Sequence, residues 1–163
     1  MARRIGRAEL AGAVASSTGY LANALDDFPR ALAAYQQALD LARRSHNARR
    51  QLRALVRLGT ASALAINYPA ARYLAQALAL ARRTHQPGAE ADVYSELANL
   101  ADRQHQPALA LAYNDKALAS YRASGNWGQY YVGLLNQGIH LKNLHRYAEA
   151  EAAYHQVEAY AQQ

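Results

Sequence analysis

Arginines are the residues of this sequence whose number and spacing could most clearly do chemistry. Six of them fall within 15 residues, in a segment that we call the Arg43–Arg57 ridge: Arg43, Arg44, Arg49, Arg50, Arg53 and Arg57. Guanidinium groups bind carboxylates and phosphates, and phosphate binding requires concentrated positive charge. We interpret the ridge in three ways, as a solvated basic surface, as a site for an acidic peptide or protein, or as a nucleic-acid site.

Histidines do not form a pattern typical of a metal site. The sequence holds six, which are His46, His85, His105, His140, His145 and His155. No His-Glu-x-x-His pair occurs, and cysteine is absent. Since the first three histidines fall at expected loop positions, we interpret these residues as polar groups of turns and expect no metal.

Catalytic motifs are also missing. The sequence has no G-x-G-x-x-G or G-x-x-x-x-G-K phosphate loop, and no nucleophile occurs together with a base and an orienting group. Glu149 and Glu151 point to different faces of a helix, so we expect both to be solvated. The sequence therefore predicts a protein without a cofactor and without enzymatic activity.

Composition indicates a folded protein with a sizeable core. Of the 163 residues, 52% are hydrophobic and 18% are charged. No apolar run approaches the roughly 18 residues of a membrane span, and no apolar stretch of a secretory signal follows the basic start. We expect a cytoplasmic protein, and the excess of arginine over lysine, 16 to 2, favours a bacterial source.

Charge is distributed unevenly along the chain. Residues 1–83 hold 13 arginines and 4 acidic residues, a net charge of +9, whereas residues 84–163 hold 5 basic and 8 acidic residues, a net charge of −3. Such asymmetry is typical of chains that bind polyanions or associate head to tail.

An internal repeat organises the whole sequence. The segment Ala38-Leu-Asp-Leu-Ala-Arg-Arg-Ser-His46 returns as Ala77-Leu-Ala-Leu-Ala-Arg-Arg-Thr-His85, 39 residues later. Small residues recur upstream at Gly19, Gly59, Ala98 and Gly138, and an alanine follows each of them after 12 residues, at Ala31, Ala71, Ala110 and Ala150. Four residues further on stand Tyr35 and Tyr154 in the first and last copies. The second copy has lost one residue, which we place inside its second helix.

Each copy predicts two amphipathic helices, because apolar residues recur at helical spacing. We expect a small residue on the first helix to face a small residue on the second, with the aromatic ring beside that contact. Turn signals such as Asn67-Tyr68-Pro69 and Ser124-Gly125-Asn126 separate the helices. The predicted helices span residues 7–25, 29–45, 48–66, 70–85, 89–104, 107–124, 127–143 and 147–161.

The spacing of Gly19, Ala31, Tyr35 and Ala38 resembles the tetratricopeptide repeat, as does the Tyr147-Ala-Glu-Ala150 segment. This resemblance covers nearly the whole chain, but the period is about 40 residues and not the usual 34. Longer periods resemble the repeats of bacterial signalling regulators, where such arrays are sensor or adaptor arms. The resemblance implies an all-α fold, a right-handed α-solenoid of about eight antiparallel helices. It also implies one domain over 1–163, with repeats at about 7–47, 48–86, 87–126 and 127–163.

In this family the first helix of each pair lines a concave groove. Residues at i, i+4 and i+7 share a helix face. Counted from the small residues, that face comprises Ala13, Ser17 and Tyr20, then Arg53, Arg57 and Thr60, then Asp92, Glu96 and Asn99, and finally Val132, Asn136 and Ile139. The predicted groove changes from basic to acidic to mildly apolar along its length.

Some family members use lysines and asparagines of the groove to clamp the C-terminal carboxylates of heat-shock chaperones. Arg53 and Arg57 resemble half of that clamp, but the expected asparagine is missing from the preceding repeat. Asp92 and Glu96 in the next repeat would repel a carboxylate. We therefore disfavour a chaperone clamp.

Three functions stay open on the sequence alone. The first is a protein-interaction scaffold whose groove binds a peptide or helix of mixed charge. The second is a self-assembling module, because no polar capping helix follows the last predicted helix with its Tyr154, Val157 and Tyr160. The third is nucleic-acid binding by the Arg43–Arg57 ridge, although the twelve tyrosines needed for stacking mostly fall at packing positions.

Overall fold

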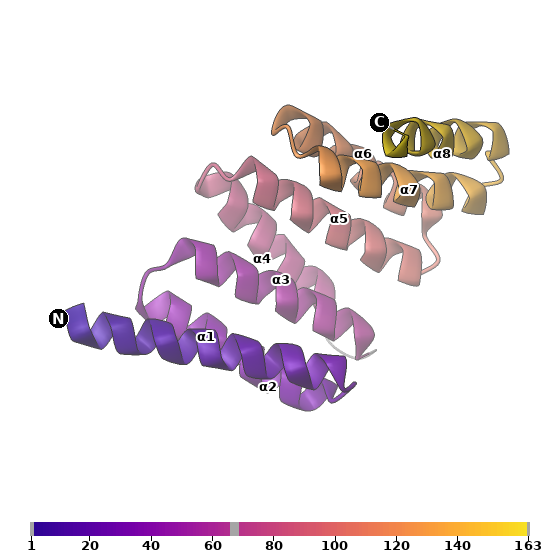
Figure 1. The fold of residues 1–163 in the computed structure, drawn as a ribbon. Helices are drawn as coiled ribbons and strands as arrows, with labels where there is room; N and C mark the ends of the chain where they lie inside the picture. Colours follow the sequence, from indigo (N-terminus) through magenta and orange to yellow (C-terminus); the bar gives the residue numbers. More distant parts are fainter. Residues whose placement is uncertain (1, 66–68, 163) are drawn as a thin grey trace. The chain divides into compact units, whose positions relative to one another are not determined.

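A computed structural model describes residues 2–65 and 69–162, with side chains from residue 6 onward. Within these residues the chain forms eight α-helices and no strand (Figure 1). The helices are α1 (Ala2–Ala24), α2 (Phe28–Arg44), α3 (Ala48–Leu64), α4 (Ala70–Arg83), α5 (Pro87–Arg103), α6 (Pro107–Ala123), α7 (Trp127–Asn143) and α8 (Tyr147–Ala161).

The predicted helices are confirmed, although α1 begins earlier than expected. The predicted end of the third helix at residue 66 lies outside the described residues, as do Asn67 and Tyr68 of the predicted turn. None of the described helices is long and apolar enough to cross a membrane.

The chain divides into two compact units, residues 1–84 and 85–163. In the first unit α1 packs on α2, α2 on α3 and α3 on α4, and in the second unit α5 to α8 pack in the same sequential way. The boundary falls next to the predicted junction between the second and third repeats. Each unit is therefore a pair of helix-turn-helix repeats, while a single domain over 1–163 stays a prediction.

Short turns with one shared geometry explain the long period. Five of the helices, α2, α3, α5, α6 and α7, have 17 residues, and three-residue turns separate most neighbours. Helix plus turn therefore repeats about every 20 residues. The middle residue of each of the six described turns has a left-handed backbone: Asp26, His46, His85, His105, Gly125 and His145.

The last residue of a turn has two roles. The Asn47 amide hydrogen donates to the Ala42 carbonyl and closes α2, while its side chain accepts from the Arg50 amide and caps α3. Asp27 and Asn126 do the same at their turns. One residue thus satisfies the end of one helix and the start of the next, which fixes the turn at three residues.

Glycine on the first helix of a pair accommodates the aromatic ring of the second. A Cβ atom on Gly19 would lie 2.5 Å from the Tyr35 ring, and one on Gly138 would lie 2.4 Å from the Tyr154 ring. The ring lies directly on the glycine, and not only beside the contact as the sequence predicted, while in the second repeat the small residue Ala70 also lies near Gly59. In the third repeat Asn114 takes the ring's place, fully buried, and donates to the Gly133 carbonyl at 3.0 Å.

The second repeat is corrected in register. Ala70 is buried and Ala71 is exposed, so Ala70 is the counterpart of Ala31. Leu74 takes the place of Tyr35, since a Cβ atom on Gly59 would lie 2.6 Å from the Leu74 side chain. The lost residue therefore lies before α4, and not inside the second helix as the sequence predicted.

Candidate functional site: a basic pocket between α1, α2 and α3

The first unit contains a pocket of about 400 Å³ between α1, α2 and α3, which we call the basic pocket. Its walls carry small side chains from α1 and α2 and three arginines from α3. The lining residues are Ala8, Glu9, Gly12, Ala13, Ser16, Ser17, Tyr20, Ala38, Leu41, Ala42, Ser45, Arg50, Arg53 and Arg57. The many alanine, glycine and serine positions leave the space into which the arginines project.

Most of the predicted groove residues of the first unit line this pocket. Ala13, Ser17 and Tyr20 of α1 and Arg53 and Arg57 of α3 are brought together. Thr60 is half-buried outside the pocket, where its hydroxyl donates to the Val56 carbonyl at 3.1 Å. The predicted groove residues of α1 and α3 thus line one pocket, with the exception of Thr60.

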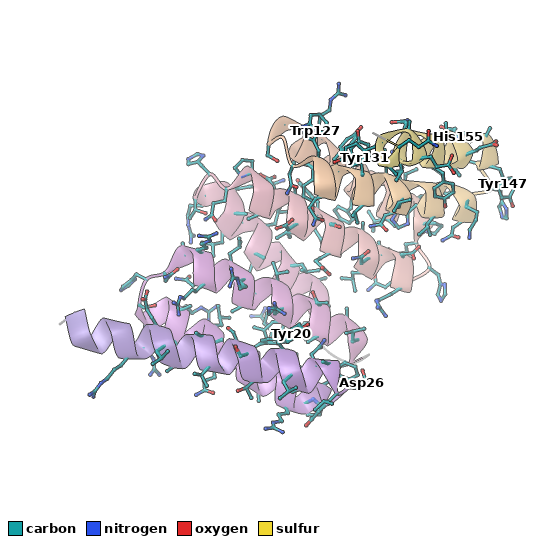
Figure 2. All side chains as sticks on the ribbon, in the orientation of Figure 1. Tyr20, Asp26, Trp127, Tyr131, Tyr147 and His155 are labelled. Atoms are coloured by element: carbon teal, nitrogen blue, oxygen red, sulfur yellow. The ribbon has the colours of Figure 1, made fainter. Side chains whose placement is uncertain are left out.

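Arg57 is held by two aromatic rings. Its guanidinium carbon lies 5.3 Å from the centroid of Tyr20 and 5.9 Å from that of Tyr35. Figure 2 shows Tyr20 on the side of α1 that faces α3. Cation–π contacts of this kind orient a guanidinium without neutralising its charge. Arg57 is therefore positioned by the core and keeps its donors for another partner.

Arg53 is exposed at the pocket, and neither Arg53 nor Arg57 makes an ion pair with any described residue. The one acidic residue of the lining is Glu9. Its carboxylate already accepts a hydrogen bond from the Asn47 side-chain amide at 3.1 Å. Arg50 donates to the Glu9 backbone carbonyl and so braces α3 against α1. The pocket thus carries an excess of positive charge that an anionic ligand can neutralise.

Three of the six arginines of the Arg43–Arg57 ridge line the basic pocket, and the ridge as a binding surface stays a prediction. Arg50, Arg53 and Arg57 line the basic pocket, whereas Arg43, Arg44 and Arg49 are exposed outside it. Arg43 pairs with Asp40 at 3.7 Å. It also borders a second hollow of about 220 Å³ with Arg72 and Tyr73.

In the second unit the predicted groove residues lie mostly at the surface. Asn99 and Ile139 are exposed, and Glu96 and Asn136 are half-buried. Asp92 is bound within the unit, because the Tyr121 hydroxyl donates to its carboxylate at 2.9 Å.

Burial of the Tyr121 phenol and the nearby Asp92 carboxylate raise the Tyr121 pKa well above its usual range. The phenol therefore stays protonated and keeps donating to Asp92, which leaves that carboxylate less available to a ligand.

His140 is a buried residue that the sequence interpretation missed. His46, His85, His105 and His145 occupy turns, but His140 is only 3% exposed on α7. Its Nδ1 lies 3.5 Å from the Asp102 carboxylate of α5, and that carboxylate accepts a hydrogen bond from the Asn143 side chain. Burial lowers the pKa of His140 more than the Asp102 carboxylate raises it. The spacing from Gly138 gave no signal for this burial, because residues two apart lie on nearly opposite sides of a helix.

Histidine, aspartate and glutamate side chains do not gather into a metal-binding group of three or more anywhere in the described part of the chain. His155 lies at the surface between Glu151 and Glu158, at 3.7 and 3.0 Å. The basic pocket therefore combines a concave shape with uncompensated charge, and it is the larger of the two hollows described here.

Comparison with solved structures identifies the fold. No protein-family model matches the chain, and no curated protein matches it. BtubC (BKLC) from P. vanneervenii superposes with a TM-score of 0.78 at 18% identity, over 91% of this chain and 62% of that one. A Rap protein complexed with Competence and Sporulation Factor superposes with a TM-score of 0.81 at 18% identity, over 94% of this chain and 42% of that one.

The chain therefore spans less than two thirds of the length of either neighbour. Together with the eight described helices, these superpositions confirm the predicted all-α class, a helical-repeat fold of the α-solenoid kind.

Proposed function

We propose that this chain is a non-catalytic scaffold of the tetratricopeptide type whose basic pocket binds an acidic side chain or terminal carboxylate of a protein or peptide partner. The observation that carries the proposal is the pair Arg53 and Arg57, which lie in a concave pocket without a carboxylate partner among the described residues. A hydrogen bond to a charged group contributes about 1.5–3 kcal/mol, so two guanidinium groups suffice to anchor a peptide.

The fold supports this proposal. The Rap protein, which shares the helical-repeat fold, was solved in complex with Competence and Sporulation Factor. By analogy we extend the proposal to an adaptor or sensor arm of a bacterial regulatory or signalling protein. The remaining predicted groove positions, Asp92, Glu96, Asn99, Asn136 and Ile139, would contact other parts of a partner of mixed charge.

Selection from a phage-displayed random peptide library tests the proposal. The wild type is expected to enrich peptides rich in Asp and Glu, and the double variant Arg53→Glu/Arg57→Glu is expected to lose them. Arg44→Glu/Arg49→Glu is the matched control, because it makes the same charge change at exposed arginines outside the pocket. Enrichment of the same acidic peptides by the pocket variant would refute the proposal.

The same variants separate the nucleic-acid alternative. A labelled RNA or DNA oligonucleotide that binds the wild type at low salt, and is lost in Arg44→Glu/Arg49→Glu, would assign the exposed arginines to nucleic acid. In that outcome, with no acidic peptide enriched, the scaffold proposal falls.

A further inference from the structure

Helix α1 and the turn residue directly after it, Leu25, expose a row of large apolar side chains to solvent. Leu10, Val14, Leu21 and Leu25 are 68%, 60%, 60% and 69% exposed, and we call these four residues the α1 stripe. At about 100° per residue they lie within a sector of about 60° on the helix. A sector this narrow is typical of a helix that pairs with another helix along its length.

The stripe lies on a helix face without charge. From Leu10 to Leu25 the sequence contains no Asp, Glu, Lys or Arg. The opposite side of α1 is already used, because Gly12, Ala15, Gly19 and Ala22 are buried in the first unit. A solvated helix face normally carries charged side chains, so an uncharged apolar face marks an interaction surface.

By contrast, α8 carries charge on its exposed side. Glu149, Glu151 and Glu158 are exposed there, and Tyr160 stacks on Tyr131 with the ring centroids 3.7 Å apart. Self-association through the last helix stays a prediction, since Tyr160 is 44% exposed there. Other apolar side chains are exposed as well, such as Val132, Leu135 and Ile139 of α7 at 41–50%, but the α1 stripe is more exposed, at 60–69%.

We propose that the α1 stripe is a dimer interface, on which α1 of a second copy of this chain packs antiparallel. The four positions of the stripe are spaced symmetrically about a point between Ser17 and Thr18. An antiparallel copy therefore places Leu10 opposite Leu25 and Val14 opposite Leu21. A two-fold interface requires this self-complementarity, because the same patch contributes both halves.

Charge complementarity selects the antiparallel arrangement. Arg7 is exposed before the stripe and Asp26 is exposed after it, in the turn that follows α1. Antiparallel packing brings Arg7 of each protomer beside the Asp26 turn of the other, twice per dimer. A parallel pair would instead bring like charges together at both ends. Antiparallel helices also align their dipoles favourably.

The interface is small, since four large side chains from each protomer cover the stripe. Interfaces below the standard size are typical of weak, reversible association. We therefore expect a monomer–dimer equilibrium that depends on concentration in the micromolar range or above. This inference is independent of the proposed function, because the arginines of the basic pocket lie on α3.

Disulfide trapping tests the geometry directly, because the chain contains no cysteine. Under mild oxidation Thr18→Cys should form a covalent dimer, since its position adjoins the two-fold axis and lies outside the lining of the basic pocket. Leu10→Cys and Leu25→Cys should each stay monomeric alone and cross-link when mixed. The control Ala119→Cys, at an exposed position of α6, should stay monomeric. Self-cross-linking of Leu10→Cys alone would indicate a parallel pair and overturn the proposal.

Sedimentation equilibrium tests the association without a covalent bond. Leu21→Glu is expected to abolish the dimer, and Leu109→Glu, at an exposed leucine of α6, is expected to leave it intact. Arg7→Glu should weaken it and Arg7→Glu/Asp26→Arg should restore it. Circular dichroism confirms that the variants stay helical. A wild type that stays monomeric at millimolar concentration, or a dimer that survives Leu21→Glu, would refute the proposal.

Discussion

The two units are built from the same helix pairs but treat their charged side chains differently. In the first unit Arg53 and Arg57 project into a pocket without a carboxylate partner. In the second unit three carboxylates are bound internally. Tyr121 donates to Asp92, Asn143 donates to Asp102, and Gln137 donates to Asp115, at 2.9, 3.3 and 2.8 Å.

This difference shows how one repeat serves two purposes. The contacts that define the pair, a glycine on one helix and an aromatic ring on the next, are the same in both units, at Gly19 with Tyr35 and at Gly138 with Tyr154. Polar positions outside these contacts are free to vary. The first unit holds Arg53 and Arg57 without a carboxylate partner, and the second unit uses its carboxylates to join its own helices.

Reversal of charge in the basic pocket should give the largest effect. Arg53→Glu/Arg57→Glu is expected to weaken binding of an acidic peptide recovered by selection about 100-fold, because truncating or reversing a desolvated charge partner costs about 2–5 kcal/mol. Asp92→Asn in the second unit should change the affinity less than about threefold, since Tyr121 already occupies that carboxylate. Fluorescence anisotropy measures both. Equal losses of peptide affinity in the two variants would contradict the claim that only the first unit binds the acidic peptide.

Gly19→Ala should be the next largest effect, on stability. Alanine normally stabilises a helix by about 1 kcal/mol relative to glycine. Here the new Cβ atom would lie 2.5 Å from the buried Tyr35 ring, so we expect a net loss of about 1–3 kcal/mol. Gly128→Ala, with no atom within 4 Å of its Cβ, is the matched control and should be neutral or stabilising. Urea unfolding followed by circular dichroism gives both values.

The same substitution at Gly138 tests whether the two units share their packing. Gly138→Ala should cost as much as Gly19→Ala, because the ring of Tyr154 lies at the same close distance. If Gly138→Ala is stabilising, the Tyr154 ring can move away from the new methyl group, and the last helix pair is less tightly packed than the first.

Acidification should affect the second unit more than the first. The pKa of His140 is lowered in the folded state, so the unfolded chain binds its proton more readily. Stability is therefore full above the ordinary histidine pKa of about 6.5 and is lost as the pH falls toward the lowered value. Urea unfolding at pH 7.5 and pH 5, followed by Trp127, the single tryptophan, reports on this unit.

His140→Leu is the control for this pH dependence. It removes the titrating group and should flatten the profile between those two pH values. His155 acts in the opposite direction, because hydrogen bonding to Glu158 raises its pKa, but it is fully exposed. The difference between wild type and His140→Leu isolates the buried histidine. Profiles of equal slope would contradict its role.

Turn substitutions should give the smallest effect, and the same one in both units. A left-handed conformation costs a residue other than glycine about 1–2 kcal/mol, and glycine loses about 0.5–1 kcal/mol of chain entropy. His46→Gly and His105→Gly should therefore each stabilise by up to about 1 kcal/mol. Gly125→Ala should destabilise by a similar amount. Thermal unfolding of the three variants checks the sign.

Most of the fold could be predicted from the sequence, because the repeat shows which residues are equivalent. Gly19, Gly59, Ala98 and Gly138 recur every 39 or 40 residues, and that spacing indicated the helix pairs and their boundaries. The missing residue of the second repeat was misplaced, because Ala70 and Ala71 are both alanine and the sequence does not say which is buried. The Asn114 contact with the Gly133 carbonyl also depends on packing across helices that spacing alone does not reveal.

The candidate site could be predicted only in part. Helical spacing placed Tyr20 of α1, and Arg53 and Arg57 of α3, on the groove-facing side of their own helices. That prediction needed only the geometry within each single helix. The separation of Arg50 from Arg49 could not be predicted, because it depends on where α1 lies relative to the turn before α3. The α1 stripe had a sequence signal that was passed over, the absence of charge from Leu10 to Leu25.

Titration with a tetraglutamate peptide, followed by NMR of the arginine side-chain Nε–Hε groups, tests the central claim most directly. Arg53 and Arg57 should shift with a common saturation curve, while Arg146, which already pairs with Glu149 at 2.7 Å, should stay unchanged. Shifts confined to arginines outside the basic pocket, or none at millimolar peptide, would contradict the claim that the first unit holds its charge for an acidic partner.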